Sequence, residues 1–238
     1  MTELAPRAGD ASSRFDKAYQ DLRNLIISGY FEPNIRLTEA ELTSLLDVSR
    51  GTIRSVLVRL THEGYLMSEP NRGVRTRFFT VEEAAAILEA REVLESALAG
   101  KAAERATAGE LDLLAAIGDE MRAAEYAHDA SEYSRLNRRF HQHIRTIARQ
   151  PILNAFVDAL VYPLVMRQYR DLTTPHPRAD SLSEHLAILA ALQTHNREAA
   201  AAAMRHHVSS ARRALLLNAG AAERAYGHAV DDRRRSDR

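Results

Sequence analysis

The C-terminal part of the chain, from residue 80 to residue 222, shows helical periodicity and no strand-like segment. Thr107, Asp129 and Asn196 are suited to cap helices, and Pro151 is suited to the first turn of one. A chain of this pattern buries its apolar faces by packing helices together, so we expect an all-helical bundle. The pattern predicts six helices, near 81–106, 108–127, 130–149, 151–170, 179–194 and 197–222.

The N-terminal part mixes helices with short strands. The expected elements are a helix over 15–28 ending at Gly29, a second helix opened by the capping box Thr38-Glu39-Ala40-Glu41, a third capped by Ser49, and strands at 65–67 and 74–79. The order helix, helix, turn, helix, β-hairpin predicts a winged helix-turn-helix. The fold class that we expect is therefore mainly α, with this unit followed by the bundle.

The expected third helix holds the candidate DNA-binding residues. In a winged helix-turn-helix this helix enters the major groove, with its N-terminal residues toward the base edges. Arginine can contact guanine through two hydrogen bonds or clamp a phosphate, and the stretch from Ser49 to His62 contains three arginines and no acid. The alternative is a solvated arginine face on an ordinary three-helix unit. The candidates are Ser49, Arg50, Thr52 and Arg54, with Arg72 and Gly73 in the wing.

The composition limits the kinds of partner and the cellular location that we expect. The 32 basic residues are balanced by 32 acidic ones, so a DNA-binding charge must be concentrated locally. There is no cysteine, which excludes disulfides and thiolate metal sites. No apolar run is long enough for a membrane span, and the N-terminus lacks a signal-peptide core. We therefore expect a soluble, cytoplasmic protein without a membrane partner.

Histidines lie beside the apolar stripes of three expected helices. Asn137 and His141 are one turn apart in 130–149, His185 lies between the apolar rows of the next-to-last helix, and His207 is beside those of the last helix. Imidazole nitrogens with an oxygen donor suit a divalent transition metal. The alternative, that each histidine is a hydrogen-bonded core residue, stays open at this point.

Two segments near the N-terminus resemble a known family. Residues 37–66, LTEAELTSLLDVSRGTIRSVLVRLTHEGYL, and the preceding IISGYFEPNIRL resemble the winged helix-turn-helix of the GntR family of bacterial transcription regulators. The resemblance implies DNA contacts at Arg50, Thr52 and Arg54 and a wing glycine at Gly73. A second-helix arginine that contacts DNA in some relatives corresponds to Ala40 here.

The helical half resembles the FCD effector-binding domain found in the FadR subfamily. REVLESALAGKAA at 91–103, NRRFH at 137–141 and the segment 184–208 carry this resemblance. It implies a divalent metal ion, zinc or nickel, held by Asn137, His141, His185 and His207. Six helices rather than seven indicate the VanR-like branch. Arg91 is a candidate clamp for a small carboxylate effector, and its alternative is an ion pair with Glu95 or another acid.

The hypothesis that follows is a homodimeric transcription regulator that binds a palindromic operator in double-stranded DNA and responds to a small organic acid at the metal site. The domains that we expect are a disordered tail at 1–13, a winged helix-turn-helix at 14–79, an effector-binding and dimerisation domain at 80–222, and a disordered tail at 223–238. Two alternatives are a metal-dependent enzyme with an appended DNA-binding-like domain, and a DNA-binding regulator whose histidine cluster is purely structural.

Overall fold

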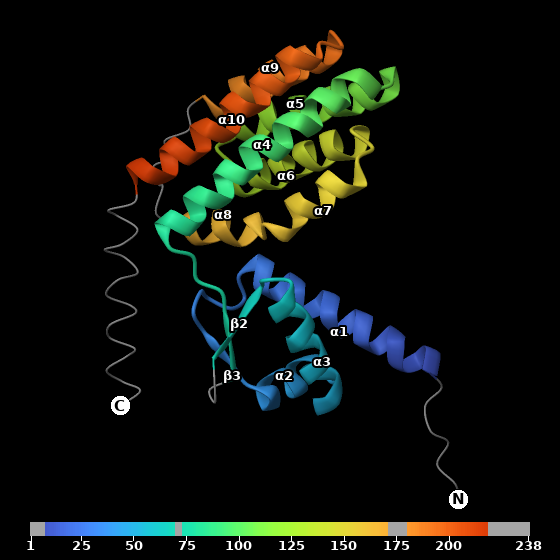
Figure 1. Cartoon of the computed structure of the whole chain (residues 1–238), viewed down its shortest axis with the longest axis vertical. Helices are drawn as coiled ribbons and strands as arrows, with labels where there is room; N and C mark the ends of the chain where they lie inside the picture. Colours follow the sequence, from blue (N-terminus) through green and yellow to red (C-terminus); the bar gives the residue numbers. More distant parts are fainter. Residues whose placement is uncertain (1–7, 70–72, 171–179, 219–238) are drawn as a thin grey trace, which may run out of the picture. The chain divides into compact units, whose positions relative to one another are not determined.

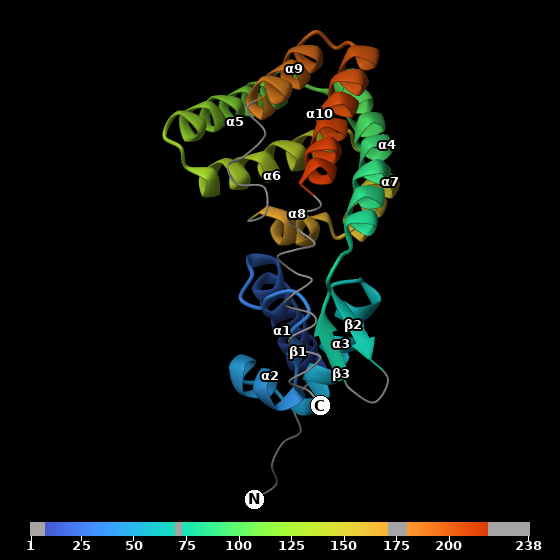
Figure 2. The same cartoon turned by 90° about the vertical axis from the view of Figure 1, so that its left-hand side faces the viewer.

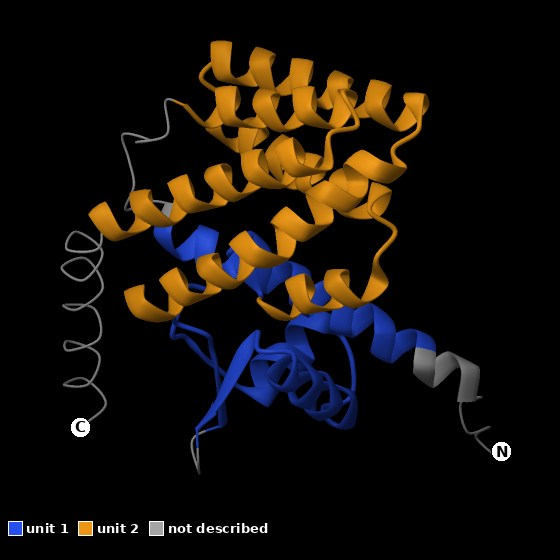
Figure 3. Ribbon diagram, turned by 45° about the horizontal axis from the view of Figure 1, so that its top comes forward, with its two compact units in different colours: residues 1–80, 161–170 blue, residues 81–160, 171–238 orange. Residues whose placement is uncertain are grey.

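The computed structural model describes residues 8–69, 73–170 and 180–218. It divides into two compact units, residues 1–80 with 161–170 and residues 81–160 with 171–238 (Figure 3). The first unit therefore includes a short segment from the second half of the chain. The wing residue Arg72 and the expected tail at 223–238 lie outside the described residues.

The first unit consists of helices around a small sheet. Its elements are α1 (Ala8–Ser28), β1 (Arg36–Leu37), α2 (Glu39–Leu46), α3 (Arg50–His62), β2 (Leu66–Glu69), β3 (Gly73–Thr76) and α8 (Tyr162–Arg170), labelled in Figure 1 except for β1, which Figure 2 labels. The structure confirms the capping box of Thr38 with Glu41 and the cap of Ser49. Asp47, in the left-handed conformation, makes the turn between α2 and α3. These elements form the helix-turn-helix.

The α1 helix begins at Ala8, earlier than expected, so residues 8–13 are helical rather than a disordered tail. Leu22 and Ile26 anchor α1 in the core of the unit. Once such an anchor exists, each further residue adds a backbone hydrogen bond at little cost, so the helix extends beyond its buried part.

The wing is a three-stranded antiparallel sheet in the order β1-β3-β2. β3 pairs with β2 from Leu66↔Thr76 to Glu69↔Gly73, and with β1 through Arg36↔Arg75 and Leu37↔Val74. The sequence predicts the β2–β3 hairpin. It gives no sign of β1, because two residues are too few to show an alternating pattern.

The prediction of a single helix over 151–170 is wrong. It breaks at Val161, whose φ is +46°, into α7 (Pro151–Ala159) and α8. The described part of 81–217 therefore contains seven helices and not six, and the VanR-like branch, which rested on six, stays a prediction. Pro163, in the first turn of α8, marks the break, because proline has no N–H to donate to the carbonyl of Ala159. Contacts within the first unit then hold α8 in place: Gln168 and Phe79 exchange hydrogen bonds of 2.9 and 2.7 Å, and Tyr169 Oη donates to the Phe79 carbonyl at 2.8 Å.

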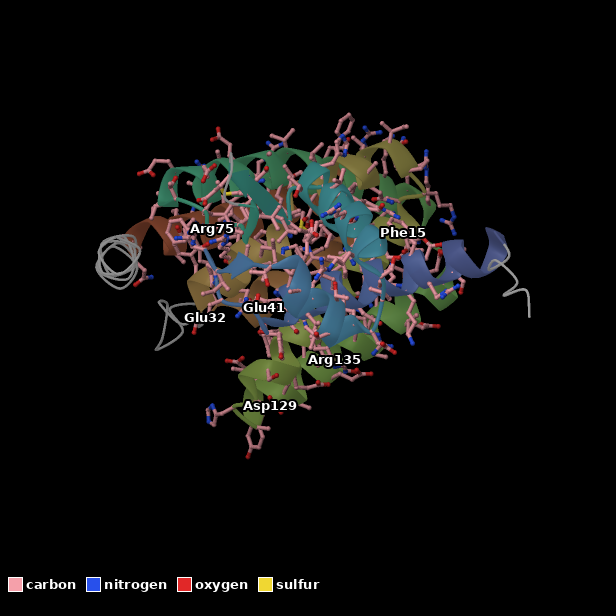
Figure 4. The ribbon with its side chains drawn as sticks, turned by 90° about the horizontal axis from the view of Figure 1, so that it is seen from below. Phe15, Glu32, Glu41, Arg75, Asp129 and Arg135 are labelled. Carbon is pink, nitrogen blue, oxygen red and sulfur yellow. The ribbon has the colours of Figure 1, made fainter. Side chains whose placement is uncertain are left out.

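The second unit is a helical bundle. Its elements are α4 (Val81–Arg105), α5 (Ala108–Tyr126), α6 (Ala130–Ile147), α7, α9 (Ser181–Gln193) and α10 (Arg197–Leu217). α10 runs along α4, and α5 packs against α6 (Figures 1 and 2). The caps expected at Thr107, Asp129 and Asn196 are confirmed, and Figure 4 labels Asp129 at the start of α6. Among the described residues, no helix combines the length and apolarity that a membrane span requires.

Candidate functional site

The α3 helix has one apolar face and one polar face. Ile53, Val56, Leu57 and Leu60 are buried in the first unit, whereas Arg50, Gly51 and Arg54 are exposed. Since the apolar residues fix how α3 is rotated, the arginines must face outward. This rotation matches the one expected for a DNA-reading helix.

Ser49 and Thr52 are tied to the start of α3. The Ser49 hydroxyl accepts from the Thr52 backbone N–H at 3.2 Å, and the two side-chain oxygens lie 2.9 Å apart. Ser49 is exposed and Thr52 is half-buried. Both hydroxyls therefore lie at the N-terminal end of α3, where one of them caps the helix.

Arg54 is held by an acid that the sequence-based prediction did not include. Its Nε donates to Glu39 Oε1 at 2.7 Å, across the gap between α3 and α2. This bond, followed by the attraction between the two charges, raises the pKa of Arg54, and the bond lowers the pKa of Glu39. The two residues are 15 positions apart, so no local pattern in the sequence links them.

The third arginine of α3 has a different role. Arg59 donates to Glu63 at 3.0 Å, and its Cζ lies 3.8 Å from the centre of the Tyr19 ring on α1. Tyr19 in turn donates to Glu63 at 2.5 Å. Burial and this bond to the Glu63 carboxylate raise the pKa of Tyr19 to about 12. Phe15, labelled on α1 in Figure 4, lies 5.8 Å from the same guanidinium. Arg59 therefore joins α3 to α1.

In the wing, Gly73 is exposed and has a φ of +85°, a conformation that glycine adopts without strain. A Cβ on this residue would meet no atom within 4 Å, so backbone conformation rather than space requires the glycine. Arg75, on the same strand, is bound to Glu69 at 3.0 Å and donates to the Asn34 carbonyl at 3.2 Å.

In the second unit, three histidines from three helices converge. One ring nitrogen each from His141 on α6, His185 on α9 and His207 on α10 lies within 4.8 Å of the others. Nε2 of His141 is 3.2 Å from Nε2 of His207, and Nε2 of His185 is 2.9 Å from Oδ1 of Asn137. The structure thus brings all four predicted ligands together.

The other nitrogen of each ring faces a hydrogen-bond acceptor. Nδ1 of His141 is 2.6 Å from Glu95 Oε2, Nδ1 of His185 is 2.6 Å from the Ser181 carbonyl, and Nδ1 of His207 is 2.9 Å from Glu184 Oε2. A carbonyl or an ionised carboxylate can only accept, so each Nδ1 carries a proton. The three Nε2 atoms are then left with lone pairs directed into the cluster.

Glu95 is the most strongly held of these acceptors. It is buried, and Arg91 Nε donates to it at 2.6 Å. Burial on its own raises the pKa of the Glu95 carboxyl, but the Arg91 guanidinium and the His141 ring lower that pKa to about 2. Glu95 is therefore an acceptor at neutral pH. The ion pair of Arg91 with Glu95 was one of the two roles considered for Arg91, and the structure contains it.

The cluster fits a divalent cation. Two lone-pair nitrogens 3.2 Å apart repel each other unless a positive charge lies between them. Nitrogens bound to a common zinc ion at about 2.1 Å lie roughly 3 to 4 Å apart, so the His141–His207 pair already has this spacing. Carboxylates and carbonyls on the outer ring nitrogens are also the usual surroundings of metal-binding histidines.

Sequence reasoning missed the acids behind the histidines. Glu184 is next to His185 in the sequence but faces His207 in the structure. Glu95 was considered only as a partner of Arg91, although it also contacts His141, 46 residues away. The four-residue spacing of Arg91 and Glu95 on one helix signals their pairing, whereas nothing in the sequence signals the two contacts between helices.

The exposed arginines of α3, set in a winged helix-turn-helix, and the helical second unit define a DNA-binding transcription regulator. The family described as bacterial regulatory proteins, gntR family, matches residues 15–75, and the FCD domain family matches residues 86–210. The chain belongs to the GntR family of transcription regulators and carries an FCD domain at its C-terminal side.

Individual relatives agree with this assignment. The HTH-type transcriptional regulator YdhC of Bacillus subtilis is 25% identical over 76% of this chain and 82% of the relative. The HTH-type transcriptional repressor RspR of Escherichia coli is 25% identical over 76% of this chain and 79% of the relative. The solved structure of E. coli McbR/YncC has the same fold, with a TM-score of 0.74 at 20% identity, covering 86% of this chain and 97% of that one.

Proposed function

We propose that this regulator binds a palindromic DNA site as a homodimer and that a small carboxylate, bound at a divalent metal site in the second unit, changes its affinity for DNA. The observation that carries the metal site is the convergence of three Nε2 atoms whose rings are each oriented by an acceptor at Nδ1. Two copies are proposed because one winged helix-turn-helix reads one half-site.

DNA contact is proposed for the exposed end of α3. Arg50 and Arg54 supply charge and hydrogen-bond donors there, and Ser49 and Thr52 lie beside the phosphate-binding backbone of the helix start. Gly73 allows the wing to turn toward the DNA, and Arg72 next to it stays a candidate from the sequence alone. DNA as the partner makes the cytoplasm the proposed location.

The proposed metal ligands are His141, His185, His207 and Asn137. Three imidazole nitrogens with an amide oxygen form a donor set suited to zinc or nickel. When bound, such an ion supplies a positive charge and open coordination positions that suit a carboxylate. The protein's own part is to keep each Nδ1 protonated and each Nε2 directed inward.

Arg91 is proposed to act on this site. Its observed partner is Glu95, which orients His141, so Arg91 supports a ligand through an acid. A direct clamp on the effector stays a prediction. The two roles differ in their consequences, since Arg91→Ala weakens metal binding in the first case and affects only effector binding in the second.

The test of the proposed function has two parts. Wild-type protein selects binding sequences from random duplexes, and its affinity for the enriched duplex is measured while a panel of small carboxylates is added, with and without zinc or nickel. We expect an enriched palindrome and a carboxylate that shifts the affinity only with metal. His141→Ala should bind the same DNA without responding. An enriched duplex that no carboxylate affects would contradict the effector part alone.

The rival functions predict other results. A metal-dependent enzyme needs a carboxylate base beside an open metal position, but the two acids beside the cluster, Glu95 and Glu184, are bonded to the outer nitrogens of His141 and His207. If the cluster is purely structural, one proton shared between Nε2 of His141 and Nε2 of His207, which are 3.2 Å apart, is enough to form a hydrogen bond between these two rings. A proton links only two of the three rings, whereas a metal ion links all three.

A further inference from the structure

An acid lies within the proposed DNA-binding surface. The first turn of α3 has no acidic residue, and Glu39, the first residue of α2, supplies a carboxylate to Arg54 at 2.7 Å. Both side chains are open to solvent, with 68% exposure for Arg54 and 37% for Glu39. A negative charge here acts against phosphate binding, so its presence calls for a reason.

Stability does not supply that reason. Solvent-exposed ion pairs contribute little to folding, because water and salt screen them and two side chains lose their freedom. Glu39 is also not the capping acid of α2. That role belongs to Glu41, labelled on α2 in Figure 4, which accepts from the Thr38 backbone N–H at 3.2 Å.

Glu39 interacts electrostatically with Arg50 and Arg54, the two arginines at the exposed end of α3. The hydrogen bond from Arg54 lowers the pKa of Glu39 most, and the charges of Arg54 and Arg50 lower it further. The observed bond to Arg54 uses Nε. The two terminal nitrogens of a guanidinium carry its other four N–H donors, and these are the atoms that reach guanine O6 and N7.

We propose that Glu39 is a specificity-determining residue that positions Arg54 for base reading and disfavours contacts with phosphate alone. This inference rests on the proposed role of Arg54. A fixed Nε holds the guanidinium in one orientation, so less freedom is lost when the terminal nitrogens meet a base. The carboxylate also repels phosphates, which lowers affinity for unrelated DNA more than affinity for the correct site.

The test compares a duplex enriched by wild-type protein with a shuffled duplex of the same composition. Glu39→Gln should bind the shuffled duplex about three to ten times more tightly than wild type, and the ratio of the two affinities should fall by roughly the same factor. The matched control is Glu41→Gln, which removes a charge from the same helix while glutamine keeps the capping box. The ratio for Glu41→Gln should equal that of wild type.

Positioning predicts a further result that general repulsion does not. In an Arg54→Ala background, Glu39→Gln should lower the affinity ratio by a clearly smaller factor, because only the repulsion of phosphates is relieved and there is no guanidinium left to orient. An equal fall of the ratio in both backgrounds, or an equal effect of Glu39→Gln and Glu41→Gln, overturns the inference. If Arg54→Ala itself leaves affinity for the enriched duplex intact, the proposed role of Arg54 fails and the inference falls with it. Misfolding is distinguishable, since it lowers binding to both duplexes.

Discussion

Arg54 and Arg59 lie on the same helix and are both exposed, at 68% and 44% of the side chain, yet they have different partners. Arg59 is turned toward Tyr19 and Glu63, while Arg54 is held at its Nε by Glu39. Charge count alone would treat the two arginines as equal. Their partners show that Arg59 joins α3 to α1, whereas Arg54 is the arginine proposed to contact DNA.

Replacing Arg54 with alanine should weaken binding to the enriched duplex by roughly tenfold or more, the cost of one lost base contact. Affinity for the shuffled duplex should fall less. A band-shift titration at fixed salt measures both. Lys17→Ala, which removes an exposed charge from α1, is the control and should have little effect. Equal losses for the two variants would mean that Arg54 provides only general charge.

Glu95 is expected to influence metal binding through His141, whose Nδ1 it contacts. Glu95→Gln should weaken zinc or nickel binding by about 10- to 100-fold, because the Nδ1 partner sets the orientation and basicity of the ring. A competitive titration with a coloured chelator measures this. Glu89→Gln, at an exposed position of the same helix, is the control. Wild-type metal affinity in Glu95→Gln would contradict the orienting role.

Tyr19 gives the first unit a pH dependence at alkaline pH. Its pKa in the folded protein is about 12, above the ordinary value of 10.0. The folded state therefore holds the tyrosine proton more tightly than the unfolded state, and the stability that this supplies is present below pH 10 and lost as pH rises toward 12. Denaturant unfolding of wild type and Tyr19→Phe between these limits should show a steeper loss for wild type. Parallel curves would contradict the effect.

Among the elements, α8 is one that the expectation of a single helix over 151–170 missed. Its residues continue the apolar pattern of α7, but Pro163 in its first turn is a local signal for a helix start that the expectation of one helix over 151–170 did not use. The placement of α8 in the first unit depends on Gln168 and Tyr169 contacting Phe79, 89 and 90 residues earlier in the chain. Local patterns contain no information on such partners.

Gln168→Ala should lower the free energy of unfolding of the first unit by about 1–3 kcal/mol. It leaves the buried Phe79 N–H without its acceptor and removes the hydrogen bond that Gln168 Nε2 donates to the Phe79 carbonyl. Chemical denaturation followed by circular dichroism measures the change. Gln20→Ala, at an exposed position of α1, is the control and should be close to neutral. If the two variants unfold alike, α8 does not stabilise this unit through Phe79.

Elements with strong local signals were predicted well. Capping residues located the starts of α2, α3, α5, α6 and α10, because a cap is a contact between residues three apart. The start of α1 and strand β1 were missed, since neither has such a signal. Likewise, the spacing of His141, His185 and His207 from the apolar residues of their own helices placed each histidine beside an apolar stripe. Their common meeting point and the acids behind them depend on tertiary packing.

For the whole molecule, the two units carry the two halves of the proposed function. The first contains the surface proposed to read DNA, and the second contains the histidine cluster. A ligand in the second unit can alter DNA binding only if its affinity differs between the arrangements that bind DNA well and poorly. The effector response thus depends first on whether the cluster holds a metal.

Metal content is the most direct measurement of that claim. Wild-type protein is exposed to zinc or nickel, dialysed and measured by elemental analysis beside His185→Ala. His143→Ala is the control, since His143 lies on the same helix as His141 but contacts the Glu110 carbonyl. We predict about one ion per chain in wild type and His143→Ala, and almost none in His185→Ala. A folded wild-type protein that retains no metal would contradict the account and leave the cluster as a hydrogen-bonded part of the core.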